Sequence, residues 1–463
     1  MKATLPKTLA SCVAIITIAS AIATATATAA TVIVPAPGAS LNLTRTNAAV
    51  SLSLSNSGDQ VWIISSSTNL VNWTEAGSWK VYNGTYHGSF TNPPAMPNVF
   101  YRAFYDPARQ NIASTTANAL LLPGTLYNYS ALTLPASFSQ PPILAQDNMP
   151  ATNTTTDTGA TLGRVLFYDK RLSTNQTISC ASCHQQAHGF SDPRQFSVGY
   201  DGSLGTRNAM GLSNARWYQR KHFFWDERAA TLEDQVLLPI QNPVEMGMTL
   251  DALTNRLALE PFYTNLFAAT FGTPDVTAEG ISLALAQFVR SIVSTRSKYD
   301  IGVSNNFANF TAQENLGRQI FNGTVGNATC AACHGTDNFT PGPALNNNGL
   351  EFPYVDKGVG AITGLTTDNG KFKVPSLRNI ELTAPYMHDG RFTNLDQVVE
   401  FYNSGVVFNA NLSPPLRAPG GNSALRLNLT TDQKAALVAF LKTLTDTNLV
   451  ADVKFSDPFN YGN

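Results

Sequence analysis

Two short stretches of the chain place two cysteines and one histidine at the same spacing. The first is Cys180-Ala-Ser-Cys183-His184, and the second is Cys330-Ala-Ala-Cys333-His334. C-x-x-C-H is the attachment signal of c-type haem, in which two thiols bond to the porphyrin and the histidine offers an imidazole to the iron. Cysteines three residues apart share one face of a helical turn, which suits two bonds to one porphyrin edge. The pattern predicts two covalently bound haems.

Two other uses of these cysteines fit the pattern less well. A thioredoxin-like redox pair does not need a histidine after it in both copies. A zinc site made of all four cysteines would leave both histidines idle. Apart from Cys12 near the N-terminus, the two motifs use every cysteine of the chain. We therefore expect haem attachment and no disulfide.

The N-terminus has the pattern of an export signal. Lys2 and Lys7 precede an apolar run over residues 9–22, and small residues end at Ala30. This predicts a signal peptide over residues 1–30 and an exported or periplasmic protein. A retained membrane anchor is disfavoured because the apolar run is short for a bilayer. Residues 9–12 resemble a lipobox, but the hydrophobic region follows the cysteine instead of preceding it.

Composition supports a globular protein of several domains. The 463 residues are 43% hydrophobic and 13% charged, with a formal net charge of −1. That content of apolar residues is enough for two or three cores. A chain without net positive charge has no general attraction for nucleic acid or for an anionic membrane, so we expect neither partner.

An internal repeat divides the chain around the two motifs. Leu162-Gly-Arg-Val-Leu-Phe167 precedes the first motif, and Leu316-Gly-Arg-Gln-Ile-Phe321 precedes the second. This repeat predicts two cytochrome-c-like helical domains, an N-terminal one over residues 159–305 and a C-terminal one over residues 306–450. Helices are expected at 228–238, 249–269, 277–297, 394–403 and 431–444.

The residues before these domains differ in kind. Alternating and β-branched runs separated by turn residues predict a small β-sandwich-like accessory module over residues 31–110. Trp62 and Trp73 are expected in its core. Residues 111–158 read as a linker or wrapping arm, and residues 451–463 as a tail. The predicted fold is mainly α, preceded by this N-terminal β-rich module.

From about residue 159 to 445 the chain resembles the bacterial dihaem cytochrome c peroxidase/MauG family. The resemblance rests on motifs in one order: Leu172-Ser173, Gly205-Thr-Arg-Asn208, Phe224-Trp-Asp-Glu-Arg228, Asn242-Pro-Val-Glu-Met246, Val374-Pro-Ser-Leu-Arg-Asn379 and Leu382-Thr-Ala-Pro-Tyr-Met-His-Asp-Gly-Arg391. It implies a peroxide-reacting haem in the N-terminal half and an electron-transfer haem in the C-terminal half.

The resemblance also implies roles for particular residues. His184 and His334 match the proximal iron ligands of the two haems. Trp225 matches a tryptophan that lies between the haems and carries electrons, a role suited to an oxidisable indole, although buried tryptophans are commonly structural. Glu245 matches the distal acid–base group, which must take a proton from one peroxide oxygen and return it to the other. A surface or ion-paired glutamate is the alternative.

Other matches concern the surroundings of the haems. Gln235 and Pro239 fall on the distal wall with Glu245, in a steric and hydrogen-bonding role. Asn208, Thr383 and Pro385 match positions that hold a calcium ion between the haems through an amide oxygen and backbone carbonyls, which are suitable hard ligands.

Two positions depart from the standard bacterial peroxidase pattern. Tyr200 replaces the histidine that caps the peroxidatic iron. Tyr402 stands where the electron-transfer haem usually takes a methionine, and no methionine follows Met387. A tyrosine ligand is the arrangement of MauG and favours the more oxidised iron. We expect Tyr402 to bind the iron of the haem on His334, with an exposed structural tyrosine as the alternative.

The sequence gives weaker indications of a function for the remaining histidines. His188 lies one turn after His184 and is expected to face solvent or a propionate. His222, three residues before Trp225, could approach the distal pocket. His388 is expected to anchor a propionate or an interdomain network in preference to binding iron.

Together the motifs predict a periplasmic dihaem peroxidase. It would reduce hydrogen peroxide with electrons that reach the second haem from a small c-type cytochrome or a cupredoxin. Two alternatives remain open: a MauG-like oxidase that modifies aromatic residues of a partner protein, and a non-enzymatic dihaem electron carrier. A carrier would have no need of Glu245 beside an open iron.

Overall fold

The computed structural model describes residues 119–460 except 329 and 343, together with the backbone of eight strands between residues 13 and 105. The described part from residue 119 onward is mainly helical, as predicted. No helix in this part is long and apolar enough to cross a membrane. The expected signal peptide lies outside the described residues, apart from strand backbone at its middle and end.

The strands form two antiparallel four-stranded sheets, ordered β1-β8-β5-β6 and β2-β3-β4-β7. Their bounds are β1 Val13–Ile16, β2 Ala30–Ile33, β3 Ser40–Arg45, β4 Val50–Ser55, β5 Gln60–Ser67, β6 Thr74–Val81, β7 Thr85–Phe90 and β8 Phe100–Tyr105. Face-to-face packing of the sheets as a sandwich stays a prediction, because the side chains, including those of Trp62 and Trp73, lie outside the described residues.

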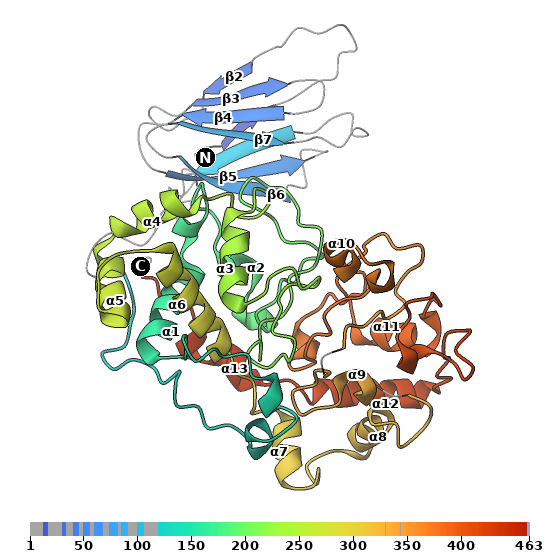
Figure 1. Ribbon diagram of the computed structural model, residues 1–463. Helices are drawn as coiled ribbons and strands as arrows, with labels where there is room; N and C mark the ends of the chain where they lie inside the picture. The colour runs from blue at the N-terminus through green and yellow to red at the C-terminus, as the bar shows by residue number, and fades with distance from the viewer. Residues whose placement is uncertain are drawn as a thin grey trace, which may run out of the picture.

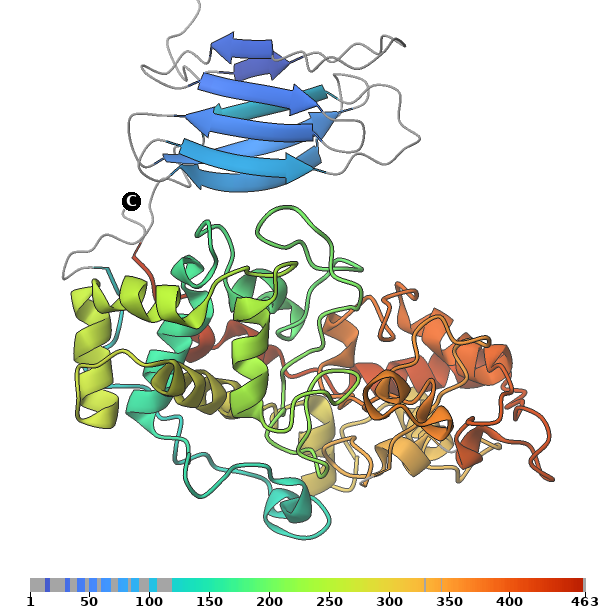
Figure 2. The same ribbon diagram turned by 45° about the horizontal axis from the view of Figure 1, so that its top comes forward.

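Two groups of helices follow, each around its own hydrophobic core. The first group comprises α1 (Asp157–Tyr168), α2 (Cys180–Cys183), α3 (Leu232–Gln241), α4 (Leu250–Ala258), α5 (Pro261–Phe271) and α6 (Ala278–Ser291). The second comprises α7 (Lys298–Ser304), α8 (Ala312–Phe321), α9 (Ala331–His334), α10 (Val359–Thr363), α11 (Leu395–Glu400) and α12 (Thr431–Lys442). Figures 1 and 2 show the first group, coloured from teal to olive, beside the second group, coloured from gold to red.

Each core is built on one close helix pair, and the two pairs are equivalent. In the first, α1 packs against α6 so closely that a Cβ on Gly163 would overlap the carbonyl oxygen of Ala284. In the second, α8 packs against α12, and a Cβ on Gly317 would overlap the carbonyl oxygen of Ala436. Only glycine allows backbones to approach this closely. The repeated Leu-Gly-Arg sequence therefore encodes a repeated helix crossing.

Side-chain caps fix where these four helices begin. Thr156 accepts a hydrogen bond from Gly159 N at the start of α1, and Thr277 caps α6 in the same way. Full capping boxes begin α8, with Thr311 and Glu314, and α12, with Thr430 and Gln433. Such caps satisfy N–H groups that have no partner inside the helix.

Several helices are shorter than the periodicity predicted. The expected helix over 249–269 is two helices, because the chain turns at Leu259 and Glu260 and Pro261 starts α5. The expected helix over 277–297 ends at Ser291 as α6. The stretch over 394–403 is α11 followed by one π-helical segment, Phe401–Gly405.

The two ends of the described chain from residue 119 onward make contacts between the two helical groups. Helix α13 (Thr447–Ala451) and the residues after it return to the first group, where Phe455 and Phe459 join its core (Figure 1). Before α1, Gln146 donates through Nε2 to the carbonyl of Pro341 at 3.1 Å, in the second group. Gln146 thus contacts the second group, while the linker or wrapping arm over residues 111–158 and the domain limits stay predictions.

Candidate functional site

The first cysteine–histidine motif opens into a cavity of about 490 Å³. Cys180 and Cys183 occupy the single turn of α2, and His184 follows at its end, with its backbone N donating to Cys180 O at 2.9 Å. All three side chains line the cavity. Burial raises the pKa of Cys180 to about 12 and that of Cys183 to about 11, so both are neutral thiols.

The second motif opens into a separate cavity of about 250 Å³. Cys330, Cys333 and His334 line it, and His334 N donates to Cys330 O at 2.9 Å. Burial raises the pKa of Cys330 to about 12. All four cysteines of the described chain are free thiols in the structure.

Both histidines are held in the tautomer that an iron ligand requires. Nδ1 of His184 lies 3.0 Å from the carbonyl oxygen of Phe190, and Nδ1 of His334 lies 2.9 Å from that of Phe339. A carbonyl can only accept, so Nδ1 carries the proton and the lone pair of Nε2 is free for a metal. Burial lowers the pKa of His334 to about 4 and also lowers that of His184, which keeps both rings neutral.

The backbone that presents these carbonyls is unusual in the same way twice. Phe190 has a φ of 61° and Phe339 a φ of 55°, a left-handed conformation that bulky side chains rarely adopt. Such strain persists where the surroundings impose it, commonly at functional sites. With two thiols, a neutral imidazole and an apolar cavity in each half, the residues fit two c-type haems.

Glu245 lies on the wall of the first cavity, together with Gln235 and Pro239. Pro239 stands four residues after Gln235 in α3, so both face the same side. The turn after α3 then places Glu245: its backbone N donates to Asn242 O at 3.0 Å, and Asn242 Nδ2 donates to Glu245 Oε1 at 3.0 Å. The structure therefore brings together the three predicted distal residues.

Burial raises the pKa of Glu245 above its usual value. The charge of Arg228 and the hydrogen bond from Asn242 act in the opposite direction, but burial dominates. A carboxyl group whose pKa is raised by burial holds a proton more readily than a free one, which suits a group that must both accept and return a proton.

Two residues considered for the first iron do not line the first cavity. The ring of Tyr200 packs on the backbone of Gly247, and Tyr200 N donates to Glu245 O at 2.8 Å. Nδ1 of His222 pairs with the carbonyl of Arg220 at 2.6 Å. His188, which belongs to the 3-10 turn Gln186–His188, also lies outside the cavity wall.

Tyr402 lines the second cavity, within the π-helical segment Phe401–Gly405. Single π-helical turns inside helices are frequent at functional sites. Met387 lines the same cavity, and Asn348 Nδ2 contacts its sulfur at 3.5 Å. Burial raises the pKa of Tyr402 to about 12, partly offset by a hydrogen bond with Asn348.

Trp225 and Asn208 line both cavities and form part of the wall between them. The indole Nε1 of Trp225 donates to the carbonyl of Asn208 at 2.8 Å. Asn208, Thr383 and Pro385, the predicted calcium ligands, all line the second cavity. Asn208 Nδ2 donates to the carbonyls of Arg194 and Gln195, and no described residue donates to its Oδ1.

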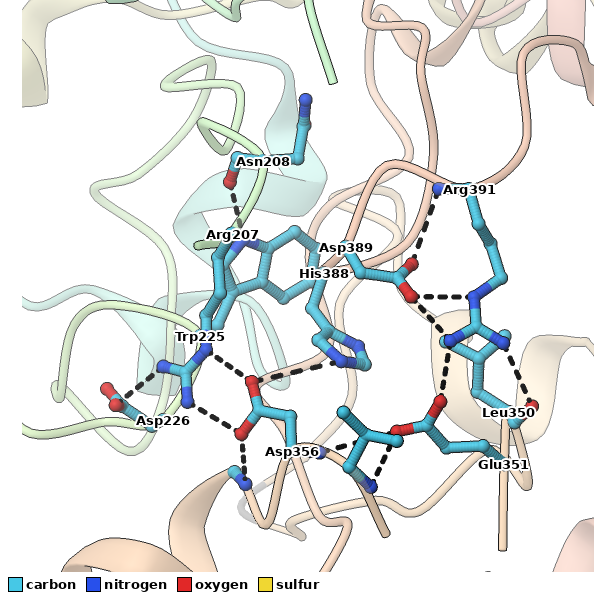
Figure 3. Close-up of polar contacts among 12 residues, drawn as sticks. Arg207, Asn208, Trp225, Asp226, Leu350, Glu351, Asp356, His388, Asp389 and Arg391 are labelled. Carbon is cyan, nitrogen blue, oxygen red and sulfur yellow. Dashed lines mark hydrogen bonds and ion pairs between the residues drawn. The ribbon is translucent and has the colours of Figure 1, made fainter. Parts of the chain in front are cut away.

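Sequence reasoning missed the ion pairs that hold this wall in place. Arg207 donates to Asp226 at 2.6 Å and, through Nε and Nη2, to Asp356 at 2.7 and 2.9 Å (Figure 3). Nε2 of His388 lies 3.9 Å from Asp356 Oδ2, and its ring stacks on Phe372 at 3.9 Å. His388 is thus part of a network between the two helical groups, as expected.

Comparison with known proteins agrees with this geometry. Residues 157–307 match the family model described as di-haem cytochrome c peroxidase. The chain is 35% identical over 295 residues to a cytochrome c551 peroxidase of Nitrosomonas europaea, which covers 62% of this chain and 79% of that protein. It is 31% identical over 300 residues to the methylamine utilization protein MauG of Methylophilus methylotrophus, covering 64% and 86% respectively.

Solved structures give the same picture. The crystal structure of a MauG-like protein associated with microbial copper homeostasis matches with a TM-score of 0.60 and 34% identity, over 69% of this chain and 99% of that one. The diheme peroxidase BthA from Burkholderia thailandensis matches with a TM-score of 0.54 at 24% identity, covering 67% and 92%, a likeness in fold.

Proposed function

Because the chain belongs to the dihaem cytochrome c peroxidase/MauG family, we propose that it reduces hydrogen peroxide to water in the cavity around His184. The family makes the protein an oxidoreductase with two c-type haems, so the electron-carrier alternative does not hold. The position of Glu245 on the cavity wall, next to Asn242, carries the proposal.

Peroxide reduction consumes two protons and two electrons for each peroxide and releases two waters. When bound, the haem on His184 supplies an iron that binds peroxide and exchanges electrons with it. The chain must provide the proton transfer. Glu245 takes a proton from one peroxide oxygen and delivers it to the other, which then leaves as water. Its raised pKa suits both directions of transfer.

Several residues around Glu245 limit what reaches it. Gln235 and Pro239 share its cavity wall, where they restrict space and offer one side-chain amide to a small ligand. Tyr200 packs on Gly247 and does not line the cavity, so we propose that no side chain caps the iron in the resting oxidised enzyme. Reaction with peroxide would then need no prior reduction.

Trp225 is proposed to connect the two haems, since it lines both cavities. Tyr402 is proposed as the second ligand of the iron held by His334, since both residues line one cavity. Asn208, Thr383 and Pro385 are proposed to bind calcium. No described residue donates to Oδ1 of Asn208, which supports this assignment, because this amide oxygen is then available to a hard cation.

We propose a small c-type cytochrome or a cupredoxin in the periplasm as the electron donor, on the strength of the N-terminal signal pattern. A MauG-like oxidation of aromatic residues in a partner protein is the second candidate. Tyr402 in the second cavity and relatives named MauG favour it.

One titration separates the two candidates. The holoenzyme is supplied with peroxide and a reduced c-type cytochrome, and oxidised cytochrome is counted against peroxide consumed. A peroxidase oxidises two cytochromes for each peroxide. Peroxide consumption without cytochrome oxidation would contradict the peroxidase function and favour the MauG-like reaction.

A further inference from the structure

Lys373 lies in the wall between the two cavities and is among the residues that line both. Only 8% of the residue is exposed. Its backbone N donates to the carbonyl of Trp225 at 2.9 Å, which fixes the lysine beside the tryptophan of the same wall. A buried lysine at such a place needs a compensating charge, because burial of an unpaired ammonium is costly.

Aromatic rings, and no carboxylate, surround the ammonium within the described chain. Nζ of Lys373 lies 3.6 Å from the ring centroid of Tyr218 and 4.9 Å from that of Phe223. Both rings line the first cavity and not the second, so the ammonium lies toward the His184 side. The charge of Glu227 acts on Lys373, but this carboxylate already accepts hydrogen bonds from Tyr218 and Arg220.

The other arginines and lysines that line either cavity are paired. Arg207 and Arg228 both pair with Asp226, and Arg378 pairs with Asp300. Lys373 alone among these described cations has no carboxylate within 4.0 Å and donates no hydrogen bond to a described residue. Burial lowers its pKa to about 7, which an anion in the cavity would reverse.

We propose that Lys373 binds a propionate of the haem on His184 and is a positioning residue that sets the redox potential of that haem. A haem brings two propionate carboxylates into the cavity, and one of them would supply the negative charge that pairs with the ammonium of Lys373. The contact would hold the edge of the porphyrin against the wall that contains Trp225. This role goes beyond peroxide turnover and rests only on haem binding.

The charge of Lys373 should be visible in the potential of one haem. A unit charge about 10 Å from an iron, at an effective dielectric of about 20, changes the reduction equilibrium about tenfold. That factor is about 59 mV for a one-electron couple. Losing the positive charge favours the oxidised iron, so the potential should fall.

The test is spectroelectrochemical titration of the holoenzyme without peroxide. Lys373→Met should lower the reduction potential of the His184 haem by about 59 mV, the equivalent of a tenfold change in its reduction equilibrium. The reduction potential of the His334 haem should change less. Lys373→Arg should keep most of the wild-type potential. Lys371→Met is the matched control: its ammonium pairs with Asp368 at 3.2 Å outside both cavities, and its loss should leave both potentials unchanged. Unchanged potentials in Lys373→Met, or an equal shift in Lys371→Met, would overturn the proposal.

A measurement on the wild type covers the case in which Lys373→Met does not fold. Resonance Raman bands of the propionates should shift in D₂O for the His184 haem, because an ammonium N–H donates to it. No shift for that haem would overturn the proposal, whatever the fate of the variants. Because neither experiment involves peroxide, failure of the peroxidase function would leave both results interpretable.

Discussion

Replacing Glu245 with glutamine removes a proton-transfer group while keeping its surroundings. The turn that positions residue 245 depends on backbone bonds, from its N to Asn242 O and from Tyr200 N to its carbonyl. A glutamine oxygen can still accept from Asn242 Nδ2, as Glu245 Oε1 does at 3.0 Å. The substitution therefore changes acid–base chemistry and little else.

The expected loss of peroxidase activity follows because the substitution removes only the proton transfer by Glu245. General acid–base groups contribute about 10²–10⁴-fold to rate, which is about 2.7–5.4 kcal/mol of transition-state stabilisation. Steady-state peroxide reduction by Glu245→Gln should fall by at least the lower factor, with haem content unchanged. Glu279→Gln, an exposed glutamate at the start of α6, is the matched control and should retain full activity. Equal rates for Glu245→Gln and the wild type would refute the assignment of the distal group.

The pH dependence of thermal stability tests the protonation state of Glu245 independently of activity. Because burial raises the pKa of Glu245 above its unfolded value, its protonated form is favoured in the folded protein. That contribution is complete below the unfolded pKa and is lost as pH rises through the folded pKa. Thermal melting should therefore show Glu245→Gln gaining stability relative to the wild type as pH rises from acid to neutral. A gain toward acid pH instead would mean that the carboxylate is stabilised.

Three further substitutions test other parts of the structure. Tyr402→Phe should change the absorption bands of the His334 haem alone, and Tyr200→Phe should change neither haem; unchanged bands in Tyr402→Phe would make that tyrosine structural. Trp225→Phe should leave the first reaction with peroxide intact and slow electron arrival from the second haem, seen by stopped-flow absorption; equal rates would remove its relay role. Gly163→Ala should lower the free energy of unfolding in urea by about 1–3 kcal/mol, because a methyl group overlaps the facing helix, whereas Gly124→Ala, in open space, should not.

The sequence alone predicted the features that depend on neighbours along the chain. The Cys-x-x-Cys-His motifs predicted two haem attachment sites, and each motif lines a cavity. The repeat before the motifs predicted two related helical domains, and each copy of it lies in an equivalent helix crossing. The family resemblance placed Gln235 and Pro239 on one wall, and their separation of four residues in α3 is the local reason that they share it. In each case the spacing within a few residues determines the geometry.

Contacts between distant residues could not be predicted in the same way. Arg207 pairs with Asp356 across 149 positions, and nothing local marks either as the partner of the other. Lys373 directly precedes the Val374-Pro motif, a position that could have drawn attention, but its lack of a carboxylate appears only in three dimensions. The helix break at Pro261 had a local signal, since proline favours the first turn of a new helix.

Rapid mixing of the fully oxidised holoenzyme with hydrogen peroxide tests the central claim most directly. Peroxide is proposed to react in the His184 cavity with proton transfer by Glu245 and without a capping side chain. The wild type should react at once, without prior reduction, and Glu245→Gln should react at least about 10²-fold more slowly. Two six-coordinate low-spin irons in the resting spectrum, with reaction only after one-electron reduction, would contradict the account.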